Sequence, residues 1–115
     1  MYKRPLAYIC KPKINTPIHI NKALNHSRVI FDHGYTPIAA NTFFDSFINN
    51  NSIAERNEVA KMNRVLIRKS FIMFVCGDYI TDEMKQEMLY ARQIGVTVVP
   101  LDGITRVTEY LKKGE

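Results

Sequence analysis

Short apolar runs alternate with amphipathic stretches along the chain. The runs hold five or six residues each and are bounded by polar residues or glycine, which is typical of strands buried in a parallel sheet. We predict four strands, over residues 6–10, 35–40, 71–76 and 96–101.

Three amphipathic stretches between these strands carry helix start and stop signals. Pro17 and Ser52 suit the start of a helix, and Gly34 and Gly95 suit its end. The predicted helices cover residues 17–33, 53–69 and 82–94. The face of the second helix that we expect to be buried carries Ile53, Val59, Met62, Val65 and Leu66.

Two further segments lie outside this alternation. Residues 41–51, with the sequence NTFFDSFINNN, predict an irregular loop rich in polar and aromatic side chains. Residues 104–113 predict a short amphipathic segment that covers an edge of the sheet.

The alternation of strands and helices predicts the fold class. We expect a single domain over residues 1–115, an α/β three-layer sandwich of the Rossmann-like (flavodoxin-like) type. Its sheet should be mainly parallel, with four to five strands and right-handed crossovers.

Composition narrows the choice of partners. The net charge of +5 favours anionic partners, but the basic residues are scattered, so we expect no duplex nucleic acid. No apolar run approaches the roughly 18 residues that span a membrane. Cys10 and Cys76 lack metal-ligand spacing, so we expect buried free thiols in a soluble, cytoplasmic protein.

We expect neither a metal ion nor a cofactor. His19, His26 and His33 recur every seven residues on the first helix, too far apart to share a metal, and are interpreted as surface or cap residues. The sequence has neither a P-loop nor a GxGxxG fingerprint.

Ligands of such sheets bind beyond the carboxyl ends of the strands. That rule selects Tyr8, Lys11, Lys13, Asn41, Phe43, Phe44, Gly77, Asp78, Thr81, Asp82, Glu83 and Glu87. Lys11 and Lys13 are interpreted either as phosphate ligands or as solvated lysines. The cluster of Phe43, Phe44 and Phe47 suits either a base-stacking surface or a satellite core.

Glu87 is the candidate acid. It borders the stripe of Met84, Met88 and Ala91 that must face the sheet, and no basic residue follows at the i+4 position. Either Glu87 points to water, as first-turn acids such as Asp82 do, or it faces a ligand.

The segments YICKP, HGYTPIAANTFF and MFVCGDYITDEMKQEMLYARQIGVTVV, in this order, resemble the nucleoside 2-deoxyribosyltransferase-like superfamily, especially its small phage and bacterial branch. The first follows a Tyr-x-x-(Ser/Gly)-Pro pattern from Tyr8 to Pro12. The last resembles Gly-Asp-x-x-Ser-x-Gly-Met-x-x-Glu, from Gly77 to Glu87. The resemblance covers about residues 6–101.

The resemblance implies that Glu87 is the nucleophile that attacks the anomeric carbon of a nucleoside, that Tyr8 orients its carboxylate, and that Asp78 or Asp82 assists. It also implies a homo-oligomer. With Met84 added from the motif, the predicted ligand contacts are Tyr8, Lys11, Lys13, Asn41, Phe44, Gly77, Asp78, Thr81, Asp82, Glu83, Met84 and Glu87.

The chain departs from the family pattern at five positions, namely Lys11, Asn41, Phe71, Thr81 and Glu83. Glutamate in place of glycine adds negative charge beside the nucleophile, and loss of an assisting acid affects proton transfer to the leaving base. These changes favour a binding protein for a nucleoside, a nucleotide or an NAD-derived molecule, such as a phage sponge for a nucleotide immune signal. The alternative is an active hydrolase or transferase of N-glycosidic bonds that uses Glu87.

Overall fold

A computed structural model describes residues 4–13 and 16–113. Its sheet has four strands, β1 (Leu6–Cys10), β2 (Thr36–Ile38), β3 (Ile72–Val75) and β4 (Thr97–Pro100), in the order β2-β1-β3-β4. All three strand pairings are parallel, with Tyr8 opposite both Ile38 and Met73. The predicted α/β class and parallel sheet are confirmed.

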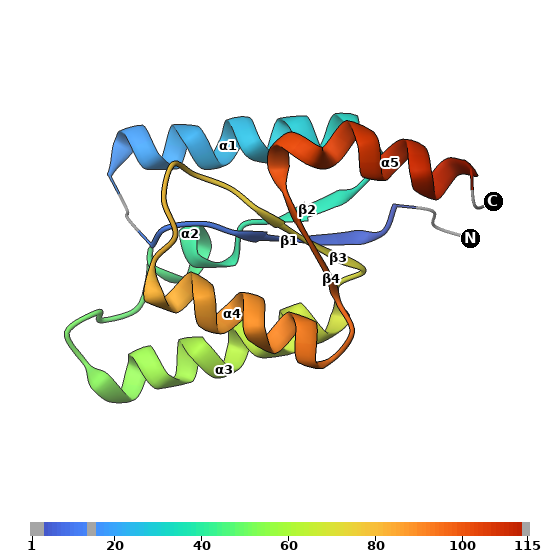
Figure 1. Cartoon of the computed structure of the whole chain (residues 1–115). Helices are drawn as coiled ribbons and strands as arrows, with labels where there is room; N and C mark the ends of the chain where they lie inside the picture. Colours follow the sequence, from blue (N-terminus) through green and yellow to red (C-terminus); the bar gives the residue numbers. More distant parts are fainter. Residues whose placement is uncertain (1–3, 14–15, 114–115) are drawn as a thin grey trace.

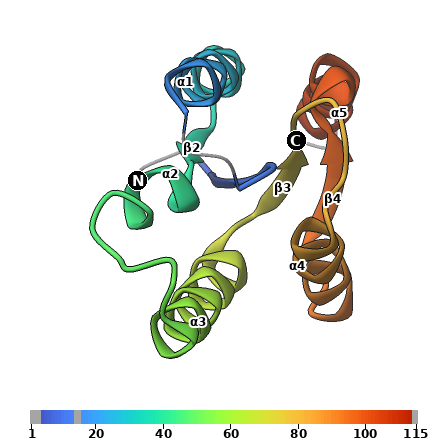
Figure 2. The same ribbon diagram turned by 90° about the vertical axis from the view of Figure 1, so that its left-hand side faces the viewer.

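Helices cover both faces of the sheet (Figures 1 and 2). Helices α1 (Pro17–Asp32) and α5 (Ile104–Lys113) lie on one face, while α3 (Ile53–Lys69) and α4 (Asp82–Gln93) lie on the other. A 3-10 turn, η1 (Leu101–Gly103), joins β4 to α5. The three long predicted helices are confirmed to within a residue at each end.

The prediction of an irregular loop over 41–51 was wrong at its start. Residues Ala40–Phe44 form a short helix, α2, and β2 ends at Ile38. A five-residue helix shows no periodicity in sequence, and a tertiary contact fixes this one: Asn63 Nδ2 donates to Asn41 Oδ1 at 2.9 Å, in a buried position.

Two packing predictions also need correction. The segment from Ile104 lies on the α1 face and not along a sheet edge, because Ile104 is buried there and Tyr35 Oη is 3.1 Å from Thr108 Oγ1. On α3, Ile53 and Val65 are exposed. The buried row of that helix is Val59, Asn63 and Ile67.

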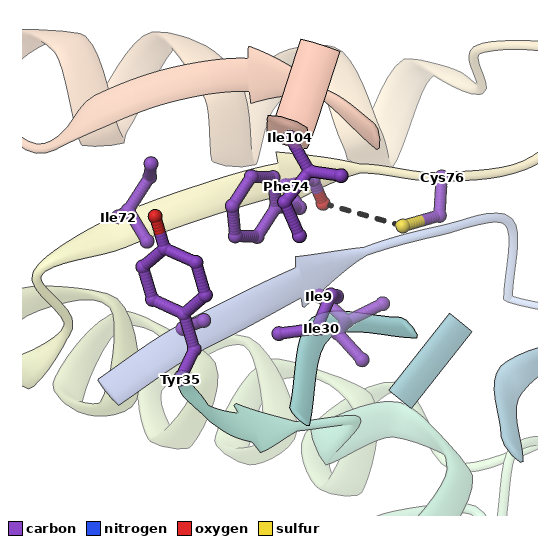
Figure 3. Packing of buried hydrophobic residues seen from close by; sticks show 8 residues of the cluster. Ile9, Ile30, Tyr35, Ile72, Phe74, Cys76 and Ile104 are labelled. Atoms are coloured by element: carbon purple, nitrogen blue, oxygen red, sulfur yellow. Dashed lines mark hydrogen bonds between the residues drawn. The ribbon is translucent and has the colours of Figure 1, made fainter. Parts of the chain in front are cut away.

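Strand alternation divides the core into two clusters. On the α1/α5 face, Ala7, Ile9, Ile72 and Phe74 pack with Ile30, Tyr35, Cys76 and Ile104 (Figure 3). On the α3/α4 face, Tyr8, Cys10 and Met73 pack with Ala40, Ile67, Met84, Ala91 and Val96. Successive strand residues point to opposite faces, so each face receives every second residue of β1 and β3.

Phe74→Ala should lower the free energy of unfolding by about 3–5 kcal/mol, because it empties a fully buried site beside Tyr35, whose ring centroid lies 5.2 Å away. Phe71→Ala, three residues earlier and 49% exposed, should cost much less. Urea denaturation measures both, and equal losses would contradict the assigned packing of β3.

Candidate functional site

Two hollows open near the carboxyl ends of β1 and β3, the strands between which the sheet order reverses. The larger, here called the α3–α4 cavity, has a volume of about 260 Å³. Its walls come from α3 (Arg56, Asn57, Val59, Ala60, Asn63 and Arg64) and from α4 (Glu83, Gln86, Glu87 and Tyr90), with Lys13 and Asn41.

The smaller hollow, here called the α1 pocket, has a volume of about 30 Å³. It lies between α1 and the segment that follows β3, and its lining comprises Lys11, Pro12, His19, Lys22, Ala23, His26, Gly77, Asp78 and Tyr79. The residues that follow β1 and β3 in sequence are therefore shared between the two hollows.

Glu87 is held from beneath by the sheet. Tyr8, which is fully buried, donates its hydroxyl hydrogen to Glu87 Oε2 at 2.8 Å. The alternation of β1 puts Tyr8 on the α3/α4 face, and the second turn of α4 brings Glu87 over it. The bond joins residues 79 positions apart and fixes one carboxylate oxygen at the cavity wall.

Burial raises the pKa of Glu87 above its usual range. The hydrogen bond from the Tyr8 hydroxyl and the nearby Cys10 thiol lower the pKa of Glu87, Glu83 raises it further, and Lys13 lowers it. Burial, reinforced by Glu87, also raises the pKa values of Tyr8 and Cys10. Both groups therefore stay protonated: the Tyr8 hydroxyl donates to Glu87, and Cys10 Sγ donates to the Met84 carbonyl oxygen at 3.8 Å.

The start of α4 fixes where its acids lie. Thr81 caps the helix, because Met84 N donates to Thr81 Oγ1 at 3.2 Å, and Met84 is buried against the sheet. Glu83 and Glu87, one turn apart, then both line the cavity. The side chain of Asp82 is 97% exposed and pairs with Lys85 at 3.8 Å.

The wall supplied by α3 is polar and basic, and sequence reasoning missed it. Arg56, Arg64, Asn57 and Asn63 all line the cavity. The available signal was Asn63, which interrupts the buried row between Val59 and Ile67 at four-residue spacing. Its Oδ1 is buried and has no hydrogen-bond partner among the described residues.

The α3–α4 cavity brings together four of the predicted ligand contacts, Lys13, Asn41, Glu83 and Glu87, with Tyr8 directly beneath. Lys13 also forms an ion pair of 3.7 Å with the largely buried Asp45.

The other predicted contacts lie elsewhere. Lys11, Gly77 and Asp78 line the α1 pocket, and Asp78 pairs with Lys22 at 3.4 Å. Thr81 and Met84 hold the start of α4, and Phe44 packs against the core of the α3/α4 face. Asp78 and Asp82, the two predicted assisting acids, are therefore absent from the cavity around Glu87.

Three other sequence observations are resolved by the structure. Phe71 precedes β3 at its amino end, away from both hollows. Phe43, Phe44 and Phe47 contact one another, with Phe43 and Phe47 exposed. His33 caps α1, where its Nδ1 lies 2.9 Å from the Val29 carbonyl oxygen.

Residues 4–13 and 16–113 contain neither a candidate metal cluster nor a candidate membrane-spanning helix. In that part of the chain, no three His, Cys, Asp or Glu side chains gather as a metal site. No helix there has the length and apolarity to cross a membrane. Cys10 and Cys76 are both free and buried, and burial raises the pKa of Cys76 to about 12.

The chain belongs to the family described as a domain of unknown function, DUF7768, whose model matches residues 5–100. Among solved structures, it is similar to the 2-deoxyribosyltransferase of Bacillus psychrosaccharolyticus, at 21% sequence identity and a TM-score of 0.65. The match covers 81% of this chain and 69% of that enzyme. No curated protein matches the sequence. The deoxyribosyltransferase-like fold is thereby confirmed.

Glu87→Gln should stabilise the protein at pH 8, because it removes a buried charge and keeps an acceptor for Tyr8. Since folding raises the pKa of Glu87, wild-type stability falls as the pH rises through the interval above the ordinary value of about 4.3. The gain should therefore vanish as the pH falls toward that value. Urea denaturation from pH 4 to pH 8 measures it.

The control for this series is Glu58→Gln, on the exposed side of α3, where the side chain is 66% exposed. That change removes no buried charge and should give no comparable gain. A Glu87→Gln variant that is less stable than wild type at pH 8 and no more stable at pH 4 would contradict the assigned burial.

Proposed function

We propose that this member of the DUF7768 family binds a nucleoside or nucleotide derivative in the α3–α4 cavity. One observation carries the proposal: the buried Tyr8 donates a hydrogen bond to Glu87, and the Glu87 carboxylate lies at the wall of a polar cavity. The likeness of the fold to that of a 2-deoxyribosyltransferase supports a ligand of the nucleoside class.

The size and chemistry of the cavity suit such a ligand. A volume of about 260 Å³ lies just below the range of ordinary small-molecule pockets, which starts at roughly 300 Å³. Asn57 and Gln86 offer amide donors and acceptors for a base or sugar, and Tyr90 offers a ring for stacking. The Glu87 carboxylate is an acceptor for sugar hydroxyls.

Basic residues at the same cavity favour a phosphorylated ligand. Arg56, Arg64 and Lys13 line it, and Arg64 lies over the Tyr90 ring with its Cζ 5.3 Å from the ring centroid. A guanidinium stacked on an aromatic ring is oriented, and arginine recognises phosphate through paired donors. A nucleoside without phosphate would leave these cations without a partner from the ligand.

Capture without turnover is the first form of the proposal. Cleavage of an N-glycosidic bond requires a proton for the departing base, and neither Asp78 nor Asp82 lines the cavity. Glu83 does line it, beside Glu87. Sequestration of a nucleotide signal, as by a phage sponge, would need only the binding.

An N-glycosidic enzyme is the second form, and the Tyr8–Glu87 hydrogen bond favours it. A Glu87 oxygen would attack the anomeric carbon, the bond from carbon to the base nitrogen would break, and the base would take a proton. Water or a second base would then release the sugar. In this form Glu83, the other carboxyl group that lines the cavity, is the candidate donor of that proton.

The first test mixes the protein with nucleosides, nucleoside monophosphates, cyclic dinucleotides and cyclic ADP-ribose isomers. We expect a saturable thermal shift with at least one phosphorylated member, lost in Glu87→Ala and kept in Glu58→Ala. Chromatography of the same mixtures decides between the two forms: intact ligand supports capture, and free base that disappears in Glu87→Ala supports the enzyme. No shift and no base with any member would overturn the proposal.

Arg64→Met should weaken binding of a nucleoside monophosphate about tenfold or more and leave that of its nucleoside nearly unchanged, because it removes a phosphate donor pair and keeps a side chain of similar length. Isothermal titration calorimetry measures both affinities. Arg92→Met, on an exposed part of α4 outside the cavity, is the matched control. Equal losses for the two ligands would contradict a phosphate role for Arg64.

A further inference from the structure

We propose that the α1 pocket is a second binding site, for a small oxyanion of the phosphate class, centred on the Lys11 ammonium group. It lies on the face of the sheet opposite Glu87 and does not depend on the function proposed for the α3–α4 cavity.

Lys11 is placed there by the alternation of β1. Ala7 and Ile9 face α1, Tyr8 and Cys10 face α4, and Lys11 continues the first row into the α1 pocket. Pro12 follows, and Lys13 lines the α3–α4 cavity instead. The two lysines thus serve different hollows.

Lys11 is a largely buried lysine whose side chain has no close partner among the described residues. The residue is 7% exposed, and its side chain forms no hydrogen bond or ion pair with any residue in the described ranges 4–13 and 16–113. Burial lowers the pKa of Lys11, and the more distant Asp45 and Glu87 only partly offset this effect. Removing an ammonium group from water is costly unless a counter-charge accompanies it, so an anion in the pocket would offset the partial burial of the Lys11 side chain.

Helix α1 adds further cationic and donor groups. Lys22 lines the pocket and pairs with Asp78 at 3.4 Å, but both side chains are at least half exposed, so the pair is weak and Lys22 is free to turn to an anion. His26 Nδ1 is buried without a hydrogen-bond partner in the described part of the chain. His19 completes this wall.

Backbone at the carboxyl end of β3 forms the opposite wall. The N–H groups of Gly77, Asp78 and Tyr79 form no hydrogen bond with described residues. Successive free N–H groups of this kind can donate hydrogen bonds to an anion. Gly77 has φ of +105°, and a Cβ there would lie 2.8 Å from Pro12 Cδ. Glycine therefore lets this backbone pack closely against the exit of β1.

The volume limits the class of ligand. About 30 Å³ holds two or three waters, or one compact anion that reaches partly into the open mouth, and is too small for a nucleoside. The anion is either free inorganic phosphate or the terminal phosphate of a longer molecule whose remainder lies outside. Both sources present the same charged oxygens to Lys11.

The test is titration of the full chain with inorganic phosphate, followed by calorimetry and by NMR of the histidine rings. We expect saturable binding in the millimolar range or tighter, weakened at least tenfold in Lys11→Met and several-fold in Lys22→Gln. Lys85→Gln, an exposed lysine outside both hollows, changes the net charge equally and should bind as wild type does.

The His26 ring gives an independent readout if Lys11→Met fails to fold. Burial lowers the pKa of His26, Lys11 and Lys22 lower it further, and Asp78 raises it, while His19 lies in the same wall. A phosphate dianion among these groups should raise the His26 pKa, whereas the same concentration of chloride should not. The rise should persist in Glu87→Ala, which separates this site from the α3–α4 cavity.

Glycerol 1-phosphate distinguishes the two sources. Binding tighter than that of inorganic phosphate indicates the end of a longer molecule, and weaker binding indicates free phosphate; either result supports the site. Three results would each overturn the proposal: binding that does not saturate up to 50 mM phosphate, a Lys85→Gln variant that weakens binding as much as Lys11→Met does, or a His26 pKa that phosphate leaves unchanged.

Discussion

Strand β1 is covered on both faces, and this constraint determines most of the molecule. Every side chain of a doubly covered strand must enter one of two layers, so polar residues in it face a buried environment whichever way they point. Tyr8 meets that condition by donating to Glu87, and this hydrogen bond ties β1 to α4. The same alternation that builds the two cores therefore also orients the candidate acid.

The parts of the fold that depend on periodicity could be predicted from sequence. The apolar runs of β1 and β3 and the capped helices α1, α3 and α4 are local patterns, and each holds within a residue or two. Helix α2 could not be predicted, because it rests on one buried contact between Asn41 and Asn63. The edge position expected of α5 failed for a similar reason: an amphipathic pattern indicates burial but not which surface provides it.

The candidate site shows the same division. Residues directly after β1, β2 and β3 are selected by topology, but topology does not say which face of the sheet each one serves. Lys11 and Lys13, only two positions apart, line different hollows because Pro12 and the end of the strand separate them. The basic wall of α3 has no sequence motif. Arginines on a helix are ordinarily interpreted as solvent-exposed residues, and only the tertiary structure shows that α4 lies opposite them.

The two native thiols have a practical consequence for labelling chemistry. Only the thiolate reacts with maleimides or disulfide reagents, and burial raises the pKa of both thiols, that of Cys76 to about 12. Cys10 and Cys76 are also covered by the two core layers. A cysteine introduced on the surface would thus react alone, so a single fluorophore or spin label can be placed without first removing the native thiols.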